Sequence, residues 1–146
     1  MITYRLADSL PATAIREIMG THNNESARRK RLEQLLDAGY GSCLLRRPDI
    51  ASLVIDNWLR FDGVRYELLA WVVMPNHVHV LVEIMDGNSV SRIVHGWKSF
   101  TAKVIARVAE VRSGIWRPDY WDRVIRDGHH FNAAVEYIVD NPVKAG

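Results

Sequence analysis

Two histidines separated by one residue are the first candidate for chemistry. They lie in a stretch, Trp71–Glu83, whose Val and Leu content favours a β-strand. Side chains alternate between the two faces of a strand, so His77 and His79 point one way and the intervening valines point the other. Their Cα atoms would lie about 6.6 Å apart, close enough for both imidazoles to bind one metal ion. Two histidines on a solvent-facing side of a strand would give the same pattern, so the pair alone leaves both interpretations open.

A tyrosine four residues before an asparagine is the second candidate. The pattern around Tyr137 and Asn141 is helical, which places the two side chains on one helix face about one turn apart. A tyrosine hydroxyl can attack a phosphodiester when a metal ion and basic groups stabilise the developing charge. Asn141 brings an amide oxygen that could complete a coordination shell begun by two histidines. The alternative for Tyr137 is a core aromatic side chain whose hydroxyl reaches the surface.

The elements that must position these residues can be predicted from hydrophobic periodicity and from turn signals. The order is strand, three helices, two strands joined at Pro75-Asn76, helix, strand and helix. The predicted ranges are 2–7, about 9 onward, 25–38, about 48–61, 64–74, 77–84, 89–109, 120–126 and 129–140. This order predicts an α+β, ferredoxin-like (RRM-like) sandwich, with an antiparallel sheet and helices packed on one face. Trp58 and Trp97 fall on apolar helix stripes, so we expect them in the core.

Length and composition limit the class of protein. A chain of 146 residues with 48% hydrophobic residues can bury a core, and we expect one domain over residues 1–146. No apolar stretch is long enough to span a bilayer, and Asp8 and Pro11 interrupt the start before a signal peptide could form. The single cysteine, Cys43, suits a reducing compartment. We therefore expect a cytoplasmic protein.

Charge is compatible with a polyanionic partner without establishing one. The formal net charge is +2 and the isoelectric point is about 8.9. A compact basic run comprises Arg28, Arg29, Lys30 and Arg31. A solvated surface is the alternative interpretation for such cations.

Taken together, the two motifs resemble the single-tyrosine HUH transposases of the insertion-sequence type, most of all their REP-associated tyrosine transposase branch. The resemblance rests on His77-Val-His79 followed by Tyr137-Ile-Val-Asp-Asn-Pro-Val-Lys-Ala-Gly146. Further stretches that agree are residues 5–11, 71–79 and 116–126, so the match spans nearly the whole chain. Either motif alone is weak, whereas their combination is specific to this family.

The resemblance implies a metal-dependent endonuclease and strand transferase that acts on single-stranded DNA. His77, His79 and Asn141 would bind Mg²⁺ or Mn²⁺, and Tyr137 would form a 5′-phosphotyrosine link. Since two imidazoles are softer than the oxygen ligands that Mg²⁺ prefers, Mn²⁺ should be accepted at least as readily. The substrate would be hairpin-forming repeat ends, which would bring the protein to the bacterial nucleoid. The protein would act as a monomer or as a homodimer that exchanges the tyrosine helix about Asp127-Gly128.

Three sets of residues are candidates for contacting the DNA through phosphate binding and base stacking. They are the basic run (Arg28, Arg29, Lys30, Arg31), a stripe on the predicted helix 89–109 (Arg92, Lys103, Arg107) and three aromatic residues (Trp116, Tyr120, Trp121). His95, His129 and His130 have no partner at a spacing suited to chelation, so we do not expect them to bind metal.

Two other functions fit parts of the pattern. A non-catalytic nucleic-acid-binding domain on the same sandwich would explain the basic surface but not the paired motifs. An HUH replication initiator or relaxase would share the chemistry. Relaxases place the tyrosine before the histidines, however, and replication initiators tend to carry a lysine at the position of Asn141.

Overall fold

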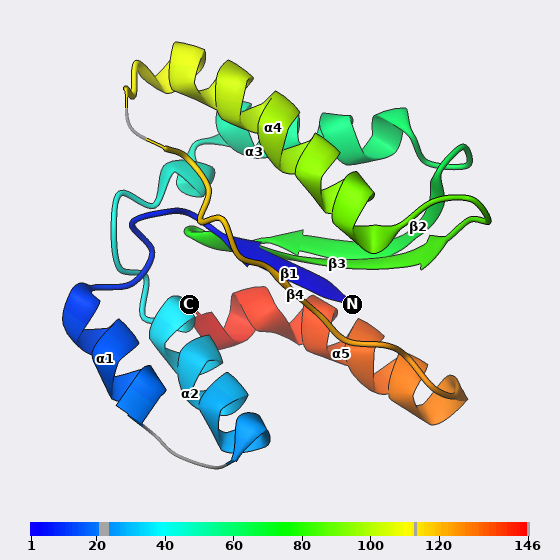
Figure 1. The fold of residues 1–146 in the computed structure, drawn as a ribbon, viewed down its shortest axis with the longest axis horizontal. Coiled ribbons are helices and arrows are strands. Elements are labelled where there is room, and N and C mark those ends of the chain that lie inside the picture. The colour runs from blue at the N-terminus through cyan, green and yellow to red at the C-terminus, as the bar shows by residue number, and fades with distance from the viewer. Residues whose placement is uncertain (21–23, 113, 146) are drawn as a thin grey trace.

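The protein is described by a computed structural model that covers residues 1–20, 24–112 and 114–145 (Figure 1). Gly146, the last residue of the tyrosine motif, lies outside the described residues. The elements, in chain order, are β1 (Ile2–Arg5), α1 (Ala12–Gly20), α2 (Glu25–Asp37), a 3-10 turn η1 (Leu44–Arg46), α3 (Pro48–Arg60), β2 (Tyr66–Val73), β3 (His77–Ile84), α4 (Val90–Ala109), β4 (Trp121–Asp122) and α5 (Gly128–Ala145). Among these helices, none combines the length and the apolar character needed to cross a bilayer.

The sheet has the strand order β2-β3-β1-β4, and every neighbouring pair is antiparallel. This is the order of the ferredoxin-like sandwich, so the predicted fold class is confirmed. The central strand β1 pairs with β3 on one side and with β4 on the other, and Thr3 lies opposite both His79 and Trp121. The bounds of β3 agree with the predicted strand, which fixes the register of the two histidines.

Helices α3 and α4 cover one face of the sheet and enclose its main core (Figure 1). Trp58 and Trp97 are buried there, as predicted, and their indole N–H groups are satisfied by tyrosine hydroxyls. Trp58 Nε1 donates to Tyr4 at 3.0 Å, and Trp97 Nε1 donates to Tyr66 at 3.0 Å. These contacts satisfy the polar tips of large aromatic side chains that would otherwise be costly to bury.

Helix α5 covers the opposite face, which corrects the expectation that helices pack on one face only (Figure 1). Ala134 and Ile138 of α5 pack against Val72 and Leu81 of the hairpin. The reason is that β3 is buried on both faces: its valines point toward α3 and α4, while His77, His79 and Leu81 point toward α5. Both faces therefore need cover.

Two predicted boundaries are also wrong. Strand β4 is limited to Trp121–Asp122, where the expected range was 120–126, because it pairs only with Ile2 and Thr3 at the sheet edge. Helix α5 does not end at Asn141 but continues through Pro142 to Ala145. A proline within a helix costs about 3 kcal/mol. Burial of Ile138 and Asn141 in this last part of the helix provides tertiary contacts that oppose the cost.

Candidate active site

The two histidines of β3 and the tyrosine of α5 meet on the face of the sheet that α5 covers. The ring centroids of His77 and His79 are 4.9 Å apart with an interplanar angle of 85°. The Tyr137 ring lies 5.2 Å from the His79 ring at 79°. The strand pattern predicted that His77 and His79 share a face, and Tyr137 follows His79 by 58 positions. These three residues therefore come together within a single chain.

The packing of α5 explains why Tyr137 reaches this place. Ile138 is 3% exposed and is inserted into the apolar cluster against β2 and β3. Burying such a side chain contributes about 1.5–3 kcal/mol. Tyr137 and Asn141 lie one helical turn apart beside this anchor, and Asn141 is 2% exposed. The apolar face of the helix thus positions its two polar residues.

Each imidazole is oriented by a hydrogen bond to its Nδ1 atom. His77 Nδ1 lies 2.8 Å from Asn76 Oδ1, and the Asn76 Nδ2 donates to the Tyr40 carbonyl at 3.1 Å. Because an amide oxygen only accepts, His77 carries its proton on Nδ1 and has a lone pair on Nε2. His79 Nδ1 lies 2.8 Å from Thr3 Oγ1, on the adjacent strand. Such partners fix the ring orientation of metal-binding histidines.

Burial keeps both imidazoles neutral near pH 7. It lowers the pKa of His79 from its ordinary value of 6.5 to about 4. The pKa of His77 is also well below its ordinary value, first because of burial and then because of the neighbouring His79. Neutral imidazole is the form that binds metal ions, so the ionisation state suits ligation.

Among the buried polar atoms that have no hydrogen-bond partner in the described part of the chain, two belong to the predicted ligands: His79 Nε2 and Asn141 Oδ1. A buried polar atom without a partner costs about 1–3 kcal/mol. These atoms are also two of the three ligands that the motifs predict, and a cation would satisfy both. The described residues contain no group of three or more His, Cys, Asp or Glu side chains that could hold a metal. A site here would therefore use the amide oxygen of Asn141 beside the two imidazoles, and the Asp37 carboxylate lies 3.8 Å from His77 Nε2.

The Tyr137 hydroxyl is in its neutral form near pH 7. Burial and the nearby charge of Glu33 raise its pKa to about 12. Its hydroxyl forms side-chain hydrogen bonds with Glu33 of α2 and with Asn141. Because Asn141 Oδ1 has no hydrogen-bond partner, the amide N–H is the group that donates to the phenol oxygen, and the amide oxygen is left for another partner.

A cleft of about 410 Å³ between α2 and α5 leads to Tyr137, and we call it the α2–α5 cleft. Its polar lining has more cationic than acidic side chains. The polar residues that line it with Tyr137 are Ser26, Arg29, Lys30, Glu33, Arg123 and His130. Cations beside a tyrosine hydroxyl suit the binding of a phosphate backbone.

The four residues of the basic run lie in different surroundings in the structure. Arg29 and Lys30 line the α2–α5 cleft. Arg28 lines an adjoining pocket of about 240 Å³ together with Trp121, which is half-buried at the sheet edge. Arg31 instead pairs with Glu17 of α1 at 2.9 Å. Three of these four cations are therefore close to the region of Tyr137.

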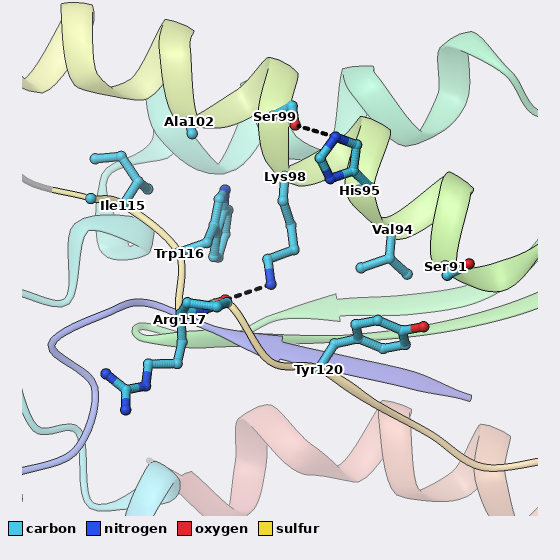
Figure 2. Close-up of a pocket in the computed structure, with 12 residues that line it drawn as sticks. Ser91, Val94, His95, Lys98, Ser99, Ala102, Ile115, Trp116, Arg117 and Tyr120 are labelled. Atoms are coloured by element: carbon cyan, nitrogen blue, oxygen red, sulfur yellow. Dashed lines mark hydrogen bonds between the residues drawn. The ribbon is translucent and has the colours of Figure 1, made fainter.

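The other predicted DNA-binding residues lie on the far face of the sheet. Arg92, Lys103 and Arg107 are exposed on α4. Trp116 and Tyr120 line a separate pocket of about 530 Å³ beneath α4, shown in Figure 2. In that view Lys98 reaches from α4 to the segment that carries both rings, and its Nζ donates to the carbonyls of Arg117 and Asp119.

Trp116 requires a correction. It is 8% exposed, packs edge-on against Tyr4 at 4.8 Å, and donates from Nε1 to Thr101 Oγ1 at 2.9 Å. The ring is part of the core, and at 8% exposure it offers little surface to the pocket for base stacking.

Several residues of the site were missed by the sequence interpretation. Asn76 directly precedes the histidine pair, so its adjacency was an available signal. Thr3 could be found only from the pairing of β1 with β3. Glu33 and Arg123 have no local signal, because charged residues on an exposed helix or loop look alike in a sequence. His95 and His129 are exposed, and His95 Nε2 lies 3.4 Å from Ser99 Oγ on α4, across the sheet from the site.

Comparisons with known proteins identify the family of this chain. The family model "Transposase IS200 like" matches residues 59–141, more than half of the chain, and the match includes both histidines and Tyr137. A REP-associated tyrosine transposase of Escherichia coli is 31% identical over 81 residues, covering 56% of this chain and 47% of the relative. A putative REP-associated tyrosine transposase of Haemophilus influenzae is 30% identical over 91 residues, covering 56% and 52%. The chain thus spans about half the length of these curated relatives.

A solved structure described as a REP-associated tyrosine transposase bound to a REP hairpin has a similar fold. The TM-score is 0.61 at 22% sequence identity, and the match covers 99% of this chain and 66% of the other. At this identity the likeness supports the fold.

Proposed function

Because the chain belongs to the IS200-like transposase family, we propose that it cuts and rejoins single-stranded DNA through a 5′-phosphotyrosine on Tyr137. The observation that carries this proposal is the position of the Tyr137 ring, 5.2 Å from the ring of a buried histidine pair. A structural tyrosine has no need of two neutral imidazoles and a buried amide with open acceptor atoms beside it.

The proposed ligands of a divalent ion, Mg²⁺ or Mn²⁺, are His77, His79 and Asn141. The two open acceptors, His79 Nε2 and Asn141 Oδ1, support this assignment, as does the lone pair on His77 Nε2. When bound, the ion would polarise the scissile phosphate as a Lewis acid. A set of two imidazoles and one amide oxygen favours Mn²⁺ at least as much as Mg²⁺.

The side chains of the protein have separate tasks in this proposal. Tyr137 Oη attacks the phosphorus and displaces the 3′-oxygen, while the Asn141 N–H holds the phenol oxygen in place. Arg29, Lys30 and Arg123 of the α2–α5 cleft bind phosphates that flank the attacked one. Attack by a different 3′-hydroxyl on the phosphotyrosine would rejoin the strands.

Hairpin-forming repeat ends are the proposed substrate, in line with the hairpin named for the structurally similar transposase. A monomer is the proposed acting form, because α5 packs on its own sheet and completes the constellation within one chain. Exchange of α5 with a second copy would give a dimer with the same site composition.

Covalent capture of DNA tests the proposal directly. A single-stranded oligonucleotide carrying a repeat hairpin, incubated with Mn²⁺, should give a cut product and a protein–DNA adduct that survives denaturing electrophoresis. Tyr137→Phe should abolish the adduct and retain binding, whereas Tyr40→Phe, at an exposed tyrosine outside the candidate DNA contacts, should behave as the parent. An adduct that persists in Tyr137→Phe would exclude the assigned nucleophile. Metal-independent binding without any adduct would instead favour a non-catalytic binding domain.

A further inference from the structure

Glu33 lies across the α2–α5 cleft from the nucleophile and has no role in the chemistry described so far. It is half-buried on α2, whereas Tyr137 projects from α5, and both line the same cleft. A side-chain hydrogen bond joins the two groups. A carboxylate in contact with the attacking atom can act on that atom directly.

The direction of this hydrogen bond follows from the chemistry of the groups. An ionised carboxylate only accepts, so the phenol O–H is the donor. The amide N–H of Asn141 donates to the phenol oxygen, which leaves the phenolic proton directed at Glu33. The O–H bond that must break during attack thus has a carboxylate base beside it.

We propose that Glu33 is the general base that removes the phenolic proton of Tyr137 during cleavage, an inference that rests on the proposed function. The proton passes from Tyr137 Oη to a carboxylate oxygen as Oη forms its bond to phosphorus. The P–O3′ bond breaks, and its electron pair leaves on O3′, which takes a proton from water. In rejoining, the incoming 3′-hydroxyl loses its proton to water as its oxygen displaces the tyrosine oxygen from phosphorus, and the Glu33 carboxyl returns its proton to Oη.

The surroundings of Glu33 suit this role. Burial raises the pKa of the Glu33 carboxyl above its ordinary value, and Asp37 one turn later on α2 acts in the same direction. Arg29 on α2 and Arg123 beyond β4 lower the pKa, but the net shift is upward, so the Glu33 carboxylate is a stronger base than an ordinary glutamate. A general base of this kind contributes about 10²- to 10⁴-fold to the rate.

Substitution and chemical rescue can separate a base from a purely structural contact. Under single-turnover conditions, Glu33→Gln and Glu33→Ala should cleave a hairpin-bearing oligonucleotide about 10²-fold or more slowly than the wild type. Added formate should restore cleavage by Glu33→Ala in proportion to its concentration. It should not restore cleavage by Glu33→Gln, whose amide still fills the space. Glu25→Gln, on the exposed first turn of the same helix, is the matched control and should stay within about threefold of the wild type.

DNA affinity and circular dichroism of each variant establish that the fold and the cleft are retained. The role of Glu33 would be overturned if Glu33→Gln cleaved within about threefold of the wild-type rate. It would also be overturned if formate did not restore the activity lost in Glu33→Ala. A wild-type protein that forms no adduct would refute the proposed function itself, and with it this role.

A third measurement needs no DNA. The ¹³Cζ resonance of Tyr137, assigned by its absence in Tyr137→Phe, should shift in Glu33→Gln and not in Glu25→Gln. An unchanged resonance would exclude the contact.

Discussion

Replacing Thr3 by valine should weaken metal binding without touching a metal ligand. The Thr3 hydroxyl lies 2.8 Å from His79 Nδ1, and the two residues are 3% and 1% exposed, so water cannot easily replace the lost partner. Loss of a second partner of this kind lowers metal affinity about 10- to 100-fold, or about 1.4–2.7 kcal/mol. The buried Nδ1 left behind should also lower the free energy of unfolding by about 1–3 kcal/mol.

Calorimetric titration with Mn²⁺ and urea denaturation in the presence of a chelator would measure these two effects separately. Thr101→Val is the matched control. Thr101 is 1% exposed and accepts a hydrogen bond from Trp116 on the other face of the sheet, so its loss should reduce stability and leave Mn²⁺ affinity unchanged. Equal Mn²⁺ affinity in Thr3→Val and the wild type would refute the argument that this hydroxyl orients His79. Equal weakening in both variants would show that the effect is general destabilisation.

Two further predictions concern acidity and DNA. Since burial lowers the pKa of His79 from 6.5 to about 4, the unfolded chain takes up a proton in this range that the folded chain does not. Without metal, the free energy of unfolding should therefore fall by up to about 1.4 kcal/mol per unit as pH drops from 6.5 to 4, and His79→Gln should reduce the slope measured in urea at several pH values. The double variant Arg29→Ala, Lys30→Ala should weaken binding of single-stranded DNA and flatten its salt dependence by about two phosphate contacts. The variant Arg92→Ala, Lys103→Ala, on the far face, should weaken DNA binding less when affinity is measured by fluorescence anisotropy. A larger loss of affinity in this variant than in the Arg29, Lys30 variant would indicate that DNA binds along α4.

The sequence was informative where the chemistry depends on local periodicity. The period of two in β3 predicts that His77 and His79 share a face, and the helical spacing predicts the same for Tyr137 and Asn141. The order of elements along the chain predicted the ferredoxin-like class, and the structure then gave the strand order. Local patterns therefore supplied the parts of the candidate site.

Contacts between distant segments could not be predicted in this way. Nothing near Glu33 in the chain indicates that α2 will lie against α5, and Trp116 has the same local appearance whether it stacks on DNA or packs on Tyr4. The sequence placed the end of α5 too early because Pro142 favours termination of a helix. In the structure, tertiary contacts of the buried Ile138 stabilise the helix beyond this point. Each error arose where tertiary packing overrode a local preference.

Helix α5 carries both the attacking oxygen and one proposed ligand, whereas the imidazoles belong to the sheet. A rigid helix moves these two groups together, so a displacement of α5 away from β3 would withdraw the nucleophile and open the coordination shell at the same moment. The pair of imidazoles is 1% exposed when α5 is docked, which means that a DNA phosphate can approach them only as the helix or its neighbour α2 gives way. Under the proposed function, entry of the DNA strand and completion of the catalytic site would both depend on the same movement of α5, and a protein with an undocked helix would not cut DNA.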